Sequence, residues 1–235
     1  MVIDTSIFSS LSVMASTWAM VWLDVLMIIY TLWVFSLIKP KDTKIMNILG
    51  FTMITWLILL YLGLSTRSIF PADISGIAFL GVIFLFVGII GIALFFFRPI
   101  RSFLLELDQR QLLLLQGIRV FFGATFLMQA SLGILPTGFG IVDGYTHIGA
   151  GFFGLIAAFS LAQGVNGTRR AWFANIFGLA DILVVASSLA LVLLKDIGPY
   201  HSMMYAVFFP APLWLWLHII SIWKLVGNSK VVRTF

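Results

Sequence analysis

The sequence of 235 residues contains no cysteine and few charged residues. Without cysteine, disulfides, thiolate metal sites and cysteine nucleophiles are excluded. Only 10% of the residues are charged, whereas a soluble domain has about 25%. The mean hydropathy is +1.11, so the composition predicts a membrane protein whose main partner is the lipid bilayer. The net charge of +5 does not indicate a nucleic-acid partner here, because Lys and Arg in membrane-protein loops set orientation.

Recognisable catalytic and cofactor motifs are also missing. There is no HExxH zinc motif. A retinal Schiff base needs a lysine in the middle of a span, and the last span offers only Lys224 at its edge. His147 and His218 differ in predicted depth by ~18 Å, too far to clamp one haem, although His201 in an outer loop could approach His147. We predict no cofactor and no bound metal, and we favour a protein that is not an enzyme.

Seven apolar stretches are long enough to cross a membrane as helices. They cover residues 17–38, 45–65, 74–97, 112–135, 144–161, 172–194 and 202–226. We therefore predict an all-α bundle of seven transmembrane helices that forms a single domain over residues 1–235. The mixed segment after Arg98 predicts a short interfacial helix, with Leu104, Leu105 and Leu107 towards the lipid.

Small residues and prolines predict two features of the packing. Gly151, Gly154 and Ala158 follow His147 at helical spacing in the fifth span. This smooth strip indicates a close neighbouring helix. The prolines within residues 210–212 should bend the last span.

The basic residues divide unevenly between the two sides that seven spans would define. One side holds only Arg67 and Lys195. The other holds eleven: Lys39, Lys41, Lys44, Arg98, Arg101, Arg110, Arg169, Arg170, Lys224, Lys230 and Arg233. Because basic loops stay in the cytoplasm, the amino terminus is predicted outside and the carboxyl terminus inside. We expect a cell membrane, in particular a bacterial inner membrane.

Three ionisable side chains are predicted to share one depth in the inner half of the membrane. Counted along their spans, Arg119 and His218 lie ~12 Å and Asp181 ~14 Å from the inner face, with Gln116 and Asn175 one turn below. An arginine in mid-span costs about 2.5–3.5 kcal/mol and needs a partner. We interpret these five residues as a binding or relay site in which Arg119 pairs with Asp181 and His218 accepts protons. The alternative is a purely structural ion pair.

A second polar group is predicted near the outer face. It consists of Asp24, Gln129 and His147, with Asp143 close by in sequence. Roughly 10 Å or more of apolar chain should separate it from the inner cluster. Solvation at the interface is the simpler explanation for His147.

Three runs in the second half of the chain resemble a family of uncharacterised bacterial multi-pass membrane proteins. They are LLxxQxxR ending at Arg119, FLxxxxxGxLP from Phe126 to Pro136, and NxxGLxD from Asn175 to Asp181. The family pattern has Gly-Asp where this chain has Thr146-His147. The resemblance implies that Gln116, Arg119, Asn175 and Asp181 belong to one shared design, and it supplies no activity.

These observations leave three classes of function open. A small proton-linked transporter or permease is slightly favoured, with a proton or a small solute moving past the inner cluster. The second class is a non-catalytic subunit or scaffold of a larger assembly, bound to a membrane protein partner or to further copies of the chain. An intramembrane enzyme or redox protein ranks last because no motif supports it.

Overall fold

The computed structural model describes residues 5–38 and 43–232, and these residues form helices joined by short turns, with no strand. The prediction of an all-α chain is confirmed for this part. Lys39 and Lys41, predicted in a basic turn, and Arg233 lie outside the described residues. The elements are α1 (Thr5–Ile38), α2 (Thr43–Ser65), α3 (Gly76–Phe96), α4 (Arg98–Glu106), α5 (Gln109–Leu114), the 3-10 turn η1 (Leu115–Ile118), α6 (Arg119–Ser131), α7 (Thr137–Gln163), α8 (Gly167–Ser188), the π-helical turn η2 (Leu189–Leu193), α9 (Leu194–Ile197), α10 (Met204–Phe208) and α11 (Pro210–Val232).

Six helical segments are long and apolar enough to cross a membrane. Among the described residues these are Leu11–Leu37, Thr43–Ser65, Gly76–Phe96, Gln109–Ser131, Thr137–Gln163 and Gly167–Ile197. Large apolar side chains point away from the bundle, and Phe51, Ile77 and Phe96 are each more than 70% exposed. An apolar outer surface of this kind suits lipid rather than water. The structure is therefore compatible with a multi-pass membrane protein.

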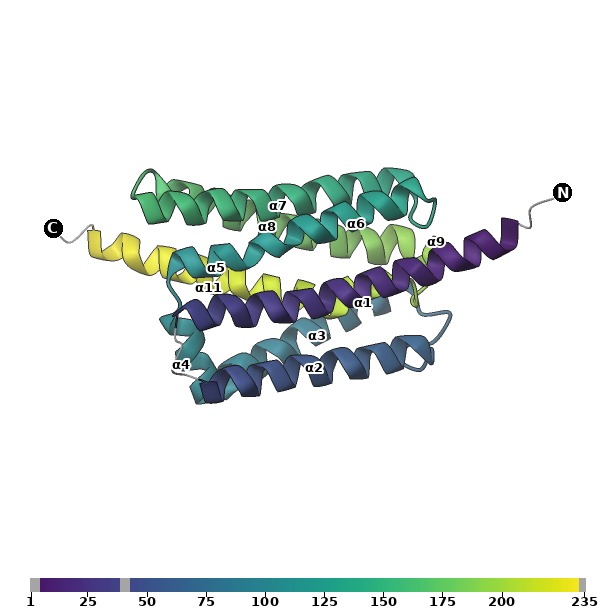
Figure 1. Ribbon diagram of the computed structural model, residues 1–235, viewed down its shortest axis with the longest axis horizontal. Coiled ribbons are helices and arrows are strands. Elements are labelled where there is room, and N and C mark those ends of the chain that lie inside the picture. Colours follow the sequence, from purple (N-terminus) through teal and green to yellow (C-terminus); the bar gives the residue numbers. More distant parts are fainter. Residues whose placement is uncertain (1–4, 39–42, 233–235) are drawn as a thin grey trace.

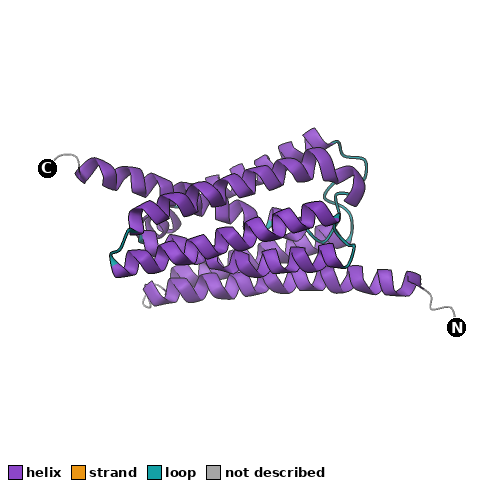
Figure 2. Cartoon of the chain, turned by 90° about the horizontal axis from the view of Figure 1, so that it is seen from above, coloured by secondary structure: helices purple, strands orange, loops and turns teal. Residues whose placement is uncertain are grey.

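The helices run roughly along one axis and form layers (Figures 1 and 2). In Figure 1, α5 to α8 lie in the upper layer, α2 and α3 in the lower layer, and α1 and α11 between them. The packing agrees, because α7 contacts both α6 and α8, while α11 contacts α8 on one side and α3 on the other. The side chains of α11 therefore reach the centre of the molecule.

The start of α7 differs from the prediction for a local reason. The sequence TGFG after Pro136 indicates a turn, and the fifth span is predicted from Gly144, but the helix begins at Thr137. Pro136 is its N-cap residue, and proline disfavours the helical conformation of the residue before it, so the helix can begin here but not earlier. Gly164, with φ of 70°, ends α7. The residues of α7, His147 among them, thus lie further from the start of their helix than expected.

The predicted lipid-facing placement is wrong for two of the three leucines in and directly after α4. Leu104 and Leu107 are buried, and Leu104 packs with Phe35, Leu49 and Ile220 from three other helices. Leu105 remains half-buried. The apolar face of this amphipathic helix therefore covers the end of the bundle instead of facing lipid.

The predicted close neighbour of the fifth span is the segment from α5 to α6. A Cβ atom added at Gly151 would lie 2.9 Å from the backbone nitrogen of Val120, and one at Gly154 would lie 2.9 Å from the carbonyl oxygen of Leu113. Neither site has room for a side chain, so glycine permits the two backbones to approach. This prediction is confirmed.

Proline interrupts the last helical segment, as predicted. The helix α10 ends at Phe208, and α11 starts at Pro210 after a break at Phe209. The break frees backbone carbonyls, and the indole N–H of Trp56 donates to the carbonyl of Phe208 at 3.1 Å. The two pieces are therefore held by a neighbouring helix where the backbone ladder stops.

Candidate binding site in the buried polar network

Arg119 lies at the centre of a buried polar network. It is the first residue of α6 and is 0% exposed. Its Nη2 forms an ion pair with Oδ2 of Asp181 on α8, and its Cζ lies 5.0 Å from the ring centre of Trp214. The predicted pairing of Arg119 with Asp181 is confirmed. Each charge supplies the partner without which the other would be costly to bury.

The second terminal nitrogen of Arg119 is held by two further contacts. Nη1 donates to the carbonyl oxygen of Gly178 at 3.3 Å and to Nε2 of His218 at 3.2 Å. Arginine has no acceptor, so Nε2 of His218 must be unprotonated here. A Cβ at position 178 would lie 2.5 Å from Cε1 of His218. The glycine in α8 is thus what allows the imidazole and the guanidinium to meet.

The hydrogen-bond network continues from Nδ1 of His218, on the opposite side of the imidazole ring. Asn175 donates through Nδ2 to the carbonyl of Ala171 at 2.8 Å and to Oγ of Ser221 at 2.7 Å. Its Oδ1 therefore accepts from Nδ1 of His218 at 2.9 Å. These bonds assign a neutral imidazole to His218, and a second proton on it would face the Arg119 guanidinium. His218 is accordingly placed as an anchor for Arg119 and is a poor proton acceptor in this arrangement.

His147 lies beside Asp181, not in a separate outer cluster. Its Nδ1 is 3.3 Å from Oδ2 of Asp181 and 2.8 Å from Oδ1 of Asp143, and the ring is only 4% exposed. The predicted gap between the clusters is wrong because α7 begins at Thr137, which puts His147 about 15 Å down the helix axis. The depth difference between His147 and His218 is wrong for the same reason. His147 is neither solvated nor near the end of its helix.

Asp143, His147 and Asp181 form a compact group, named the Asp–His–Asp group below. Their ligand atoms all lie within 4.8 Å of one another. Both carboxylate oxygens of Asp143 and Oδ1 of Asp181 lack a hydrogen-bond donor, and neither close contact of His147 Nδ1 has the geometry of an N–H···O bond. A buried carboxylate without a partner is strongly unfavourable. The group is therefore suited to taking up a cation.

Sequence reasoning did not select Asp143 as a site residue. The available signal is its spacing from His147, because residues four apart share one face of a helix. Reading the helix as starting after Asp143 concealed that spacing. The carboxylate is 1% exposed in the structure, so it belongs to the core of the site.

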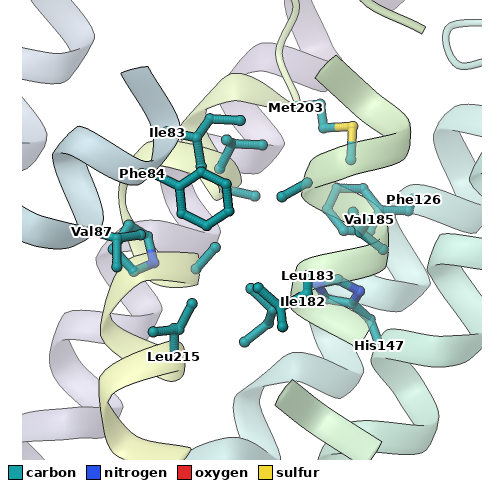
Figure 3. A pocket seen from close by; sticks show the side chains of 15 residues that line it. Ile83, Phe84, Val87, Phe126, His147, Ile182, Leu183, Val185, Met203 and Leu215 are labelled. Carbon is teal, nitrogen blue, oxygen red and sulfur yellow. The ribbon is translucent and has the colours of Figure 1, made fainter. Parts of the chain in front are cut away.

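A cavity of about 40 Å³ adjoins the His147 ring. In Figure 3 the imidazole lies at its edge, across from Ile83, Phe84 and Val87 of α3. Among the described residues of its lining, which is otherwise apolar, His147 alone is ionisable. The volume would hold one or a few water molecules, but the imidazole is the one polar side chain that this lining offers them. Phe84 and Leu183 belong to the same lining and are 47% and 39% exposed, which places an opening on the side of the bundle.

Three predicted site residues do not join the network. Gln116, Gln129 and Asp24 are each buried, and the polar atoms of their side chains have no hydrogen-bond partner among the described residues. Gln116 faces α7, where Gly154 approaches its Cβ. Of the predicted inner cluster, the structure therefore brings together Arg119 and Asp181 with His218 and Asn175.

A family model matches the part of the chain that contains this site. The family described as Domain of unknown function (DUF8737) matches residues 77–226, which is more than half of the chain, and the chain belongs to this family. The match begins in α3 and ends in α11, so it contains the whole network around Arg119. No curated protein and no solved structure matches the chain.

Proposed function

We propose that this member of the family is a proton-linked membrane transporter whose working site is the Asp–His–Asp group. The observation that carries the proposal is the meeting of three buried ionisable side chains: Nδ1 of His147 lies 2.8 Å from Asp143 and 3.3 Å from Asp181, and neither oxygen of Asp143 accepts a hydrogen bond. A residue that only holds helices together would be expected to be hydrogen-bonded. Ionisable side chains that meet inside a membrane typically belong to an ion or proton pathway.

The charges of the site favour exchange of one positive charge. Arg119 neutralises one of the two carboxylates, through its ion pair with Asp181. Asp143 then needs a proton or another cation to avoid a net buried charge. His147 borders the cavity and also approaches both acids through Nδ1. Imidazole can take a proton at one nitrogen and release it from the other, so His147 would pass protons between the cavity and Asp143.

The broken helix supplies a way for the site to open. Ala206 and Val207 of α10 and Ala211 and Pro212 of α11 line the cavity beside His147. They flank the break at Phe209. Helices interrupted in the membrane commonly form transport sites, because the two halves can move separately. A small rotation of α10 would enlarge the cavity next to the ring.

The proposal includes seven membrane crossings with the start of α1 outside. Two observations support it. The helix α11 has 23 residues and lies along the other long helices, and the start of α1 and the end of α11 lie at opposite ends of the bundle (Figure 1). At the end of the bundle where α1 starts, Arg67 follows α2 and Lys195 lies in α9. Arg98 and Arg101 belong to α4 at the other end. The positive-inside rule assigns this richer basic end to the cytoplasm.

A scaffold in a larger membrane assembly is the second candidate. The observation that favours it is the chain of buried hydrogen bonds through His218, which links Nη1 of Arg119 to Asn175 and Ser221. Such a chain of bonds can simply fix helix positions. This candidate predicts a stoichiometric partner on the exposed apolar surface and no flux.

Reconstitution into sealed vesicles with an internal pH dye separates the two functions. The transporter predicts acidification or alkalinisation of the lumen that follows an imposed gradient of protons or of a coupled solute. It also predicts that His147→Gln slows this flux, because glutamine cannot exchange protons. Flux-free vesicles across a broad solute screen, together with co-purification of a stoichiometric partner, would establish the scaffold instead.

A further inference from the structure

We infer that the Asp–His–Asp group is a binding site for a divalent first-row transition-metal ion, held by Asp143, His147 and Asp181 in exchange for protons. The inference rests on the proposed function only in making this ion the transported solute. The binding site itself depends only on the arrangement of the three side chains.

The spacing of the ligand atoms fits a shared metal ion. A metal bound at about 2.0–2.2 Å from nitrogen and oxygen holds neighbouring ligand atoms about 2.8–3.6 Å apart. Nδ1 of His147 lies 2.8 Å from Oδ1 of Asp143 and 3.3 Å from Oδ2 of Asp181. Both separations lie within that range. The three ligand atoms, from the two helices α7 and α8, all lie within 4.8 Å of one another, so small side-chain rotations would bring them around one ion.

The directions of these contacts also favour a metal over a simple hydrogen bond. If His147 only donated a proton to an acid, the acceptor would lie in line with an N–H bond. Nδ1 of His147 and both oxygens of Asp143 have no contact of that geometry, and all are buried. Oxygens placed to the side of a ring nitrogen are what a metal on its lone pair produces. The carboxylate of Asp143, buried and without a hydrogen-bond donor, is the independent indication of a cation site.

The donor set selects the class of ion. One imidazole nitrogen and two carboxylates suit Mn²⁺, Fe²⁺, Co²⁺ or Zn²⁺, whereas Ca²⁺ and Mg²⁺ prefer oxygen ligands throughout. Arg119 supports the site from outside through its ion pair with Asp181, since metal-bound carboxylates are usually held by a further hydrogen bond. The guanidinium also lowers the negative charge, which leaves the site suited to a divalent ion rather than to one of higher charge.

Metal and proton would compete for the same atoms. A metal binds the deprotonated carboxylates and the neutral imidazole, so it displaces any proton shared by Asp143 and His147. Affinity should fall as the pH falls. This competition is the coupling that a metal transporter driven by a proton gradient requires.

The test uses the full chain purified in detergent and stripped of metal with a chelator. Titration with Zn²⁺ in a calorimeter should show one saturable site per chain, and Co²⁺ should give a visible absorption band of nitrogen and oxygen ligation. Asp143→Asn and His147→Asn should each weaken Zn²⁺ binding at least tenfold. Asp24→Asn is the matched control, because Asp24 is also a buried acid without a partner but contributes no ligand, and it should bind as wild type does.

Folding is checked separately, so that a damaged variant cannot imitate a lost site. Asp143→Glu keeps a carboxylate in a shifted position and should retain Zn²⁺ with an altered Co²⁺ spectrum. The absence of a saturable site in the wild type, or unchanged affinity in both Asp143→Asn and His147→Asn, would overturn the inference. Zn²⁺ binding without flux of Zn²⁺ or protons in vesicles would support the metal site and contradict the proposed transport function. Proton flux without Zn²⁺ binding would support the transport function and contradict the metal site.

Discussion

Replacing Gly178 with alanine tests whether the contact between Arg119 and His218 depends on a missing side chain. The new Cβ would lie 2.5 Å from Cε1 of His218 and 3.2 Å from Nη1 of Arg119. It would also clash with Nε2 of His218, which is bonded to Cε1. Ordinary contacts begin near 3.4 Å. The imidazole must therefore move by roughly 1 Å, and its hydrogen bond from Arg119 would break.

The expected cost has two parts. Overfilling a packed interior costs about 1–3 kcal/mol. Leaving the Arg119 N–H group without its acceptor costs a further 1–3 kcal/mol, roughly. We therefore expect Gly178→Ala to lower the free energy of unfolding by about 2–6 kcal/mol. The assay is reversible unfolding in mixed micelles, followed by circular dichroism.

Gly81→Ala is the matched control, because a Cβ at Gly81 in α3 meets nothing within 4 Å. The alanine there should be neutral or stabilise the helix by up to about 1 kcal/mol. In a His218→Ala background the clash is gone, so Gly178→Ala should cost much less than in the wild type. A Gly178→Ala protein as stable as wild type, or an equal cost in both backgrounds, would refute the reasoning.

Three further predictions address the ion pair, pH and topology. Arg119→Gln and Asp181→Asn should each cost about 3–5 kcal/mol of unfolding free energy by stranding a buried charge, and the double variant should recover part of that loss in a mixed-micelle unfolding series. Burial in the loop before α10 lowers the pKa of His201, with a smaller opposing effect of its hydrogen bond to a backbone carbonyl. Unfolded chains then bind more protons than folded ones below the ordinary histidine pKa of about 6.5. Stability should thus fall as the pH drops below that value, and His201→Gln should show a smaller fall in thermal melts; equal slopes would contradict this. Single cysteines at Ser102 and Gly138 should label from opposite sides of intact cells, with only Gly138 open to an impermeant reagent, and labelling of both from outside would reject the orientation.

Hydropathy, together with the depth of each residue along its span, was enough to predict the helices and the ion pair between Arg119 and Asp181. Arg119 and Asp181 meet because both lie in spans that run in the same direction from the same face, so a count of residues gives their depth. The same counting misplaced His147, because its helix starts at Thr137 instead of Gly144. Glycine and aspartate after Pro136 resemble a turn in isolation. Packing against α6 through glycine contacts, which include Gly140 against Ala130, makes the helix the better structure.

Counting residues along each span could not predict which helices lie side by side. Leu104 lies in, and Leu107 directly after, an amphipathic helix that the sequence assigns to the membrane surface, yet both are buried. Which helix lies beside α4 depends on the whole bundle, and that information is spread over several spans. Gln116 shows the converse error, since it has the right depth but faces α7 at Gly154 and not the ion pair. Depth follows from position along the chain, whereas the facing partner follows from rotation about the helix axis.

The most direct measurement of the central claim compares proton flux into vesicles that contain equal amounts of Asp143→Asn and Asp24→Asn protein. Both changes remove a buried acid without a hydrogen-bond partner, but only Asp143 contacts His147. The account predicts that Asp143→Asn abolishes the flux, while Asp24→Asn retains the wild-type rate. Equal rates in the two variants, with wild-type flux present, would contradict the assignment of the Asp–His–Asp group as the working site.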